Sequence, residues 1–181
     1  MLLNHDTVIE GQKCTLVPYS KECVEEYHSW FIKYPELLEC TGSELLSLEE
    51  EYSNQESWEQ DENKLTFLIH KNGMLCGDIN AFFSDFFAED FELDVLQCES
   101  PLIAELNLMI AEPSCRRQGI AQEALDMFVE YIERKMDNVI VLVAKILKSN
   151  MGSILFFEKN NFIKYKTLNC FNEVHYMKKV R

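Results

Sequence analysis

The sequence is short of positive charge. Its 17 lysines and arginines stand against 31 aspartates and glutamates, which gives a net charge of −14 at pH 7. A protein this anionic is repelled by the phosphates of nucleic acids and by anionic membrane surfaces, so we expect neither as a partner. A cationic partner suits the charge better, and an acidic surface that only keeps the protein soluble is the alternative.

The sequence also lacks paired cysteines, clustered histidines and long apolar runs. The seven cysteines include no Cys-x-x-Cys pair, which excludes a disulfide framework and a zinc knuckle. The four histidines have no cysteine or carboxylate at metal-ligand spacing, so we expect no metal. No uncharged apolar run approaches the roughly 18 residues of a membrane helix, and the start, MLLNHDTVIEG, does not have the pattern of a signal peptide. We therefore expect a protein of a reducing compartment, the cytoplasm and as a second location the nucleus.

No repeat, low-complexity tract or linker divides the chain, so we predict one domain over residues 1–181. Hydrophobic periodicity and turn residues predict a strand, two helices, three strands, a helix, a strand, a helix and two strands. The predicted strands are 7–19, 65–70, 74–83, 103–111, 139–145, 162–168 and 173–179, and the helices follow Ser20, Ser47 and Gly119 and span 150–160. This order predicts an α/β fold in which helices flank a mixed sheet.

Local signals predict where several elements begin and turn. Ser20 is the expected cap of the first helix, and Ser47 with Glu50 has the spacing of a capping box at the second. Asn72-Gly73 supplies the positive φ angles of a tight hairpin turn. The helix after Gly119 connects two strands that we expect to be parallel and joined right-handedly.

An acidic, phenylalanine-rich stretch spans residues 84–102, with six carboxylates and no basic residue. Long loops are often tolerated insertions, which favours an ordinary solvated loop here. A mobile lid near a cationic substrate is the alternative.

The sharpest chemical feature is the turn Arg116-Arg117-Gln118-Gly119-Ile120-Ala121, between a predicted strand and a predicted helix. At a helix N-terminus the unpaired amides and the positive end of the dipole face outward, so a diphosphate can accept several hydrogen bonds there. Gly119 and Ala121 keep the approach open, and Arg116 and Arg117 add two positive charges. The glycine patterns of nucleotide hydrolases and NAD-binding proteins are absent. Taken alone, the 116–121 turn also suits an ordinary strand-to-helix connection with surface arginines.

This turn resembles the acetyl-CoA site of the GNAT acyltransferase superfamily, whose pattern Q/R-x-x-G-x-G/A is matched by Arg116, Gly119 and Ala121. Family members also carry an Asn that opens the last main helix, like Asn150, and an aromatic-Glu-Lys-x-Gly-Phe string. Residues 157–162 are similar to that string, with Asn in the place of Gly, and Asn tolerates the left-handed conformation. Within the superfamily the chain is most similar to N-acetyltransferase 9 proteins, along MLLNHDTVIEGQKCTLVPY, GDIN and MIAEPSCR.

The resemblance implies a single GNAT domain with a strongly twisted mixed sheet, a splayed parallel strand pair and acetyl-CoA as cofactor. It assigns main-chain groups around Leu108, Met109 and Ile110 to the pantetheine and the acetyl carbonyl, and Asn150 and Phe157 to the cofactor site. It also assigns the general base to Glu105, for which a plain salt-bridge partner is the alternative reading.

The sequence departs from the superfamily at Phe157, where many members have a tyrosine that protonates the departing thiolate. Because a thiol has a pKa of about 8.5, the thiolate is a tolerable leaving group near neutral pH. By resemblance Ser153 is the candidate donor to the sulfur, and a surface hydroxyl is its alternative reading. Asn107 stands where related proteins often carry an acid, which weighs against a paired-carboxylate mechanism. Cys115 is expected to be a packing residue and not a nucleophile.

The resemblance implies a protein amine as acceptor, with tubulin N-termini the substrates proposed for the family. At pH 7 deprotonation costs roughly 4.6 kcal/mol for a lysine but roughly 1 kcal/mol for an α-amine, so a site with few acid–base groups favours N-termini. Asp78 and Asn80 are candidate contacts for the amine, or outward polar residues of a strand. The second hypothesis is an acidic binding module on microtubules or another partner that turns over slowly or not at all, motivated by Phe157.

Overall fold

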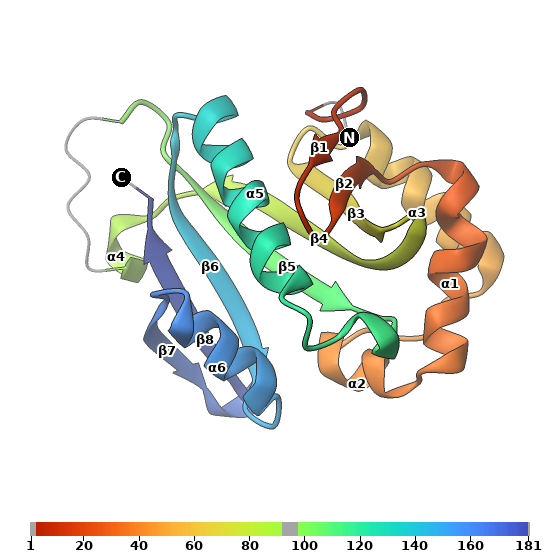
Figure 1. The fold of residues 1–181 in the computed structure, drawn as a ribbon. Coiled ribbons are helices and arrows are strands. Elements are labelled where there is room, and N and C mark those ends of the chain that lie inside the picture. The colour runs from red at the N-terminus through yellow and green to blue at the C-terminus, as the bar shows by residue number, and fades with distance from the viewer. Residues whose placement is uncertain (1–2, 92–97, 181) are drawn as a thin grey trace. The chain divides into compact units, whose positions relative to one another are not determined.

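The structure is a computed structural model that describes residues 3–91 and 98–180. Its strands are β1 (Ile9–Glu10), β2 (Thr15–Pro18), β3 (Lys64–Lys71), β4 (Met74–Asp85), β5 (Leu102–Ile110), β6 (Val139–Leu147), β7 (Ile163–Leu168) and β8 (Glu173–Lys179). Its α-helices are α1 (Val24–Lys33), α2 (Glu36–Thr41), α3 (Leu48–Gln60), α4 (Ala88–Phe91), α5 (Ile120–Lys135) and α6 (Met151–Lys159). Its 3-10 turns are η1 (Lys21–Cys23), η2 (Pro113–Cys115) and η3 (Asn169–Phe171), and Figure 1 shows the course of the chain through these elements.

The strands form a mixed sheet in the order β1-β2-β3-β4-β5-β6-β8-β7. Strands β5 and β6 are parallel, with Leu102 opposite Val139 and Glu105 opposite Val143. The pairs β1–β2, β2–β3, β6–β8 and β7–β8 are antiparallel. The predicted α/β fold with its parallel pair is therefore confirmed, and the right-handed connection of that pair stays a prediction.

The chain divides into two compact units, which are described separately below. Unit 1 consists of Met1–Ala81 and Asn107–Glu130, and unit 2 of Phe82–Leu106 and Tyr131–Arg181. The assignment of residues 1–181 to one domain stays a prediction. In the part of the chain that the structure describes, no helix has both the length and the apolar character to cross a membrane.

In unit 1, six consecutive residues of β3, Lys64 to Ile69, are buried. Because alternate side chains of a strand point to opposite sides, both faces of β3 are covered. Phe67 faces α5, with its ring centroid 6.1 Å from that of Phe128. Leu68 lies in the cluster that contains Trp30 of α1 and Met109 of β5. Each large apolar side chain buried in this way contributes about 1.5 to 3 kcal/mol. These contacts place α5, and therefore its N-terminus, against the sheet of unit 1.

Two local predictions in unit 1 are confirmed. Ser47 accepts a hydrogen bond from the backbone N–H of Glu50, and the Glu50 carboxylate accepts one from the N–H of Ser47, which is a complete capping box at the start of α3. Asn72 and Gly73 have φ angles of +52° and +80°, as the tight turn between β3 and β4 requires.

One local prediction in unit 1 is wrong, and one helix was not predicted. The cap predicted at Ser20 is wrong, because η1 precedes α1 and the Ser20 side chain makes no capping hydrogen bond. Its hydroxyl instead hydrogen-bonds to the Glu22 carboxylate, which lowers the pKa of Glu22. The sequence analysis also missed α2, a six-residue helix that begins after Pro35 and ends at Gly42 in the left-handed conformation. A helix this short has too little periodicity to stand out.

In unit 2, β6 is buried from Val139 to Ala144, as the continuous apolar run predicts. Phe86 and Phe91, from the acidic stretch, stack at a centroid distance of 5.2 Å in the core of this unit. The described N-terminal part of the stretch is therefore packed. Residues 92–97 lie outside the described part of the chain, and the loop and lid readings of the stretch both stay predictions.

Candidate functional site

The 116–121 turn lies in unit 1, between η2 and the start of α5. Gly119 has a φ angle of +79°, which residues with a side chain rarely adopt. Within the described ranges, 3–91 and 98–180, the backbone N–H groups of Gly119, Ile120 and Ala121 make no hydrogen bond. They stand at the N-terminus of a 16-residue helix, where the dipole adds positive potential. The turn therefore presents main-chain donors that suit an anion.

The side chain of Arg116 fixes the turn to the strand before it. Its Nε donates to the carbonyl oxygen of Ile110 and its Nη2 to that of Ala111, both at 2.9 Å. Arg117 is exposed, with a φ angle of +61°. Arg116 therefore positions the turn, whereas the side chain of Arg117 extends into solvent.

Two further cations, which the sequence analysis missed, lie at the turn. A Cβ atom on Gly119 would stand 2.6 Å from Nζ of Lys13, so the Lys13 ammonium lies directly against this glycine. Nζ of Lys71, the last residue of β3, donates to the side-chain oxygen of Gln118. Both lysines are far from the turn in the sequence, and the only signal was that Lys13 falls in a string that carries the family resemblance.

A carboxylate in the first turn of α5 explains the position of Lys13. Oε1 of Glu123 accepts a hydrogen bond from the N–H of Gln12 at 3.0 Å, and Oε2 accepts those of Lys13 at 2.6 Å and Cys14 at 2.9 Å. Desolvation raises the pKa of Glu123, but these hydrogen bonds outweigh it and lower the pKa overall. A Cβ atom on Gly11 would stand 2.7 Å from Oε2 of Glu123, so only glycine fits there. The connection between β1 and β2 is thus fixed to the N-terminus of α5.

The geometry of the turn fits a diphosphate. Main-chain donors without acceptors among the described residues lie beside a glycine whose missing side chain lets the Lys13 ammonium approach closely. Lys13 lies against Gly119 and Lys71 against Gln118, in a chain whose net charge is −14. A local positive region in an acidic protein is what the diphosphate of a CoA-type ligand requires.

Glu105, the candidate general base, lies on the part of β5 that belongs to unit 2. Its Oε2 forms an ion pair with Nζ of Lys145 at 2.6 Å, and the two side chains are 28% and 43% exposed. Because Glu105 pairs with Val143, Lys145 is two residues further along β6, on the same face. A pair this exposed contributes about 1 kcal/mol or less, so the carboxylate can leave it at little cost. The geometry is compatible with both readings of Glu105.

The main-chain groups assigned to pantetheine follow on the same strand, in unit 1. Leu108 and Ile110 are half-buried, and Met109 is buried in the core cluster. The Ile110 carbonyl already accepts a hydrogen bond from Arg116, so the strand end and the 116–121 turn are linked. Contacts of these groups with a cofactor stay predictions.

The candidate residues on α6 lie in unit 2. Asn150 is the N-cap of this helix, and its Oδ1 accepts a hydrogen bond from the N–H of Ser153 at 3.1 Å. Phe157 is buried, with its ring centroid 4.9 Å from that of Phe162. Asn161 has a φ angle of +65°, which confirms the left-handed conformation expected at the family's glycine position. Asn150 and Phe157 thus have structural uses, and the functions proposed for them and for Ser153 stay predictions.

Asp78 and Asn80 lie on β4 within a buried polar network of unit 1. Asn80 donates to Asp78 Oδ2 at 2.7 Å and accepts from Nζ of Lys64 at 2.9 Å. That Nζ also lies 4.0 Å from the ring centroid of Trp58. Burial raises the pKa of Asp78 to about 6, although Asn80 and Lys64 act in the opposite direction. The amine contact predicted for Asp78 and Asn80 stays a prediction, and it would require this network to open.

Cys115 lies immediately before the 116–121 turn and is buried. Its Sγ is 2.8 Å from Sγ of Cys76, which is also buried. Burial, assisted by the hydrogen bond to Cys115, raises the pKa of Cys76 to about 12. Cys115 itself is enclosed in the protein interior, which agrees with a packing role. Among the residues that the structure describes, no group of three or more His, Cys, Asp or Glu side chains is arranged to hold a metal.

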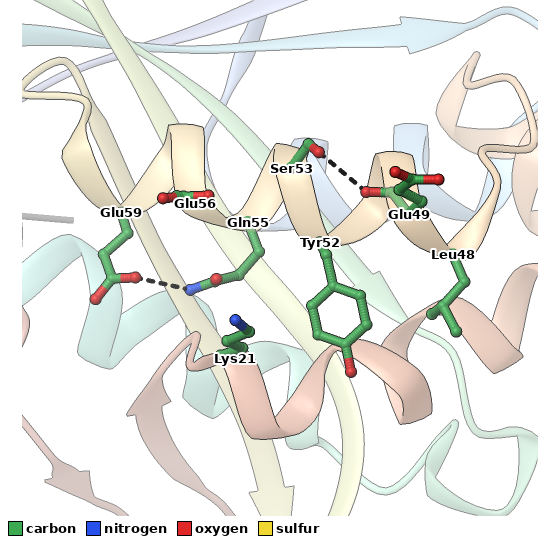
Figure 2. A pocket seen from close by; sticks show the side chains of 8 residues that line it. All are labelled: Lys21, Leu48, Glu49, Tyr52, Ser53, Gln55, Glu56 and Glu59. Atoms are coloured by element: carbon green, nitrogen blue, oxygen red, sulfur yellow. Dashed lines mark hydrogen bonds between the residues drawn. The ribbon is translucent and has the colours of Figure 1, made fainter.

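Unit 1 also contains a cavity of about 620 Å³ alongside α3, and Figure 2 shows the side chains around it. They are Lys21, Leu48, Glu49, Tyr52, Ser53, Gln55, Glu56 and Glu59. The lining contains three carboxylates and one ammonium, which is the wrong sign of charge for a diphosphate. No residue of the 116–121 turn contributes to it, so this cavity is not the phosphate site.

Comparison with known proteins identifies the family of the chain, whereas the role of the 116–121 turn stays a prediction. The family model described as "Acetyltransferase (GNAT) domain" matches residues 13–163. The chain belongs to the GNAT acetyltransferase family. It is therefore an enzyme of the acyltransferase class, and the resemblance seen in the sequence is confirmed.

Individual relatives agree with this family. The chain is 37% identical to an N-acetyltransferase 9-like protein of Dictyostelium discoideum, over 96% of this chain and 85% of the relative. It is also 37% identical to the alpha/beta-tubulin-N-acetyltransferase 9 of Mus musculus, over 96% of this chain and 71% of the relative. A solved structure of RimL, the ribosomal L7/L12 alpha-N-protein acetyltransferase, in complex with coenzyme A has a TM-score of 0.70 at 16% identity, over 96% of this chain and 98% of RimL. That likeness supports the fold.

Proposed function

We propose that this GNAT enzyme transfers the acetyl group of acetyl-CoA to the α-amino group at a protein N-terminus, and that tubulin is a substrate. The observation that carries the proposal is the 116–121 turn, with its free main-chain donors and local positive charge. The tubulin acetyltransferase named among the relatives supports the choice of substrate. The fold shared with an alpha-N-protein acetyltransferase supports the choice of an N-terminal amine.

The turn binds the phosphates of the cofactor. The N–H groups of Gly119, Ile120 and Ala121 donate to the diphosphate, while Arg116 keeps the turn against the end of β5. Arg117 adds charge from the solvent side. Bound acetyl-CoA supplies an acetyl group activated as a thioester.

Glu105 accepts the proton of the incoming amine, and Lys145 orients its carboxylate. Main-chain groups around Leu108, Met109 and Ile110 align the acetyl carbonyl, and the hydroxyl of Ser153 donates to the departing sulfur. Since a thiolate is a tolerable leaving group, this last contribution is the smallest. The α-amine is the preferred acceptor because, near neutral pH, far less free energy is needed to deprotonate it than a lysine.

The proposal is tested with three peptides of equal length and mass spectrometry of the products. The first has a free N-terminus and no lysine, the second has a blocked N-terminus and an internal lysine, and the third carries a tubulin N-terminal sequence. Free CoA and an acetylated α-amine should form with the first and third peptides and not with the second. Acetylation of only the lysine peptide would contradict the α-amine, and equal rates for the first and third would contradict a preference for tubulin.

The cysteines also bear on where the enzyme acts. Unpaired cysteines are expected in a reducing compartment, so we propose the cytoplasm as its location and the nucleus as a second one.

A further inference from the structure

We propose that Lys13 is a ligand of the CoA diphosphate and that Glu123 is the residue that positions it. This inference rests on the proposed function, because it concerns the same phosphate site. It adds a contact from the connection between β1 and β2, which lies outside the sequence pattern of the 116–121 turn.

The first observation is the place of the Lys13 ammonium. It lies 2.6 Å from the position that a Cβ atom of Gly119 would occupy. The neighbouring N–H groups of Ile120 and Ala121 have no acceptor within the described part of the chain. Nζ of Lys13 likewise makes no hydrogen bond or ion pair with any described residue. An anion bound at this place would pair with the Lys13 ammonium and accept hydrogen bonds from these N–H groups.

The second observation is that the backbone of Lys13 is fixed. Three hydrogen bonds join Glu123 to the amides of Gln12, Lys13 and Cys14. Glu123 and the carbonyl oxygen of Cys14 lie so close to Gly11 that a side chain at position 11 would clash with them. An exposed lysine ordinarily loses much conformational freedom when it binds a ligand, and a fixed backbone reduces that loss.

The third observation concerns charge. The carboxylate of Glu123 would be expected to pair with a nearby ammonium, but its oxygens accept the backbone N–H groups instead. These hydrogen bonds lower its pKa, so the carboxylate stays ionised while it holds the backbone. The Lys13 side chain is left available for a phosphate. Since the site is exposed, salt screens this interaction, and we expect it to depend on ionic strength.

The experiment compares Lys13→Met with Lys33→Met, a change at an exposed lysine at the end of α1. Calorimetry measures binding of CoA and of dephospho-CoA at two salt concentrations. Lys13→Met should weaken both ligands by the same factor, about tenfold or more at low salt and less at high salt, because both contain the diphosphate. Lys33→Met should bind as the wild type does.

Each result decides a different point. Affinity of Lys13→Met equal to that of the wild type would overturn the assignment of Lys13. A loss with CoA but none with dephospho-CoA would overturn the diphosphate as its partner. If the wild type itself bound no CoA, the proposed function would fail and the Lys13 inference with it.

The positioning role of Glu123 is tested by a double-mutant cycle. Glu123→Ala should weaken CoA binding, and adding it to Lys13→Met should weaken it little further, because both changes remove one contact. Circular dichroism and thermal unfolding verify that each variant is folded. Additive losses of affinity would show that Glu123 acts independently of Lys13 and would overturn its positioning role. Glu123→Gln, whose amide oxygen can still accept backbone hydrogen bonds, should restore part of the affinity.

Discussion

Oε2 of Glu105 lies 2.6 Å from Nζ of Lys145, on neighbouring parallel strands. The sequence left Glu105 two readings, a base and a salt-bridge partner, and the structure shows that it has a partner. The two interpretations of Glu105 assign different roles to Lys145. If Glu105 is the base, Lys145 orients it, and the carboxylate matters more than the ion pair.

Glu105→Gln is therefore expected to lower kcat by about 100-fold or more while CoA affinity stays unchanged. The amide keeps the size of the side chain but cannot accept the proton of the amine. Steady-state kinetics and calorimetry measure the two effects separately. Lys145→Met is the matched control, since it removes the ion pair but keeps the carboxylate, and it should reduce kcat only severalfold. Equal effects of the two changes would show that Glu105 serves only the ion pair.

Gly119→Ala is expected to weaken CoA binding at least tenfold. The new Cβ would occupy the space against Lys13, in a backbone conformation that costs about 1 kcal/mol for a residue with a side chain. Gly42→Ala is the control, because Gly42 also has a positive φ angle, +65°, with nothing within 4 Å of its Cβ position. Both variants should lose similar stability in urea, and only Gly119→Ala should lose affinity. Normal CoA binding by Gly119→Ala would argue against the phosphate site.

Changes at Asn150 separate capping from cofactor binding. Asn150→Asp retains an oxygen for the N–H of Ser153, so α6 should be as stable as in the wild type, whereas Asn150→Ala should cost about 1 kcal/mol. If the Asn150 side chain also contacts the cofactor, Asn150→Asp should weaken CoA binding despite its normal stability. Unfolding in urea and calorimetry on the same samples distinguish the two. Unchanged affinity in both variants would leave capping as the function of Asn150.

The stability of the protein should depend on Asp78 between about pH 4 and pH 6. Burial raises the pKa of Asp78 from 3.8 to about 6, so the folded state binds this proton more tightly than the unfolded state does. This contribution is complete below pH 4 and is lost as the pH rises through 6, by about 2 to 3 kcal/mol. Asp78→Asn should remove this part of the pH dependence. Urea unfolding at pH 4.5 and 7.5 measures it, and identical pH dependence in variant and wild type would contradict the shift.

Sequence reasoning succeeded where the deciding contacts are local. The capping box joins Ser47 to Glu50 and the hairpin turn needs two adjacent residues, so a short window contains all the information. The 3-10 turn before α1 shows the limit, because Ser20 has the right residue type but its hydroxyl binds Glu22. Local propensity cannot decide whether the hydroxyl accepts from a backbone N–H, as in a cap, or donates to a nearby side chain.

The missed part of the site depends on contacts between distant residues. Lys13 reaches Gly119 only because Glu123, 110 positions further along than Lys13, binds its backbone. The same holds for Lys71 and Gln118, which β3 and α5 bring together. Sequence patterns identified the 116–121 turn because its donors belong to one helix end. They could not identify cations that come from distant parts of the chain, such as the connection between β1 and β2 or the end of β3.

The enclosed thiol of Cys115 has a practical consequence. It directly precedes the 116–121 turn, whereas Cys40 and Cys170 are exposed. An alkylating reagent should modify the two exposed thiols first, and the buried thiols of Cys14, Cys76 and Cys115 only when the structure around each of them transiently opens. The labelling rate of Cys115 itself, followed by mass spectrometry of its peptide, would then report without any engineered probe how strongly an added ligand holds the segment around the turn closed.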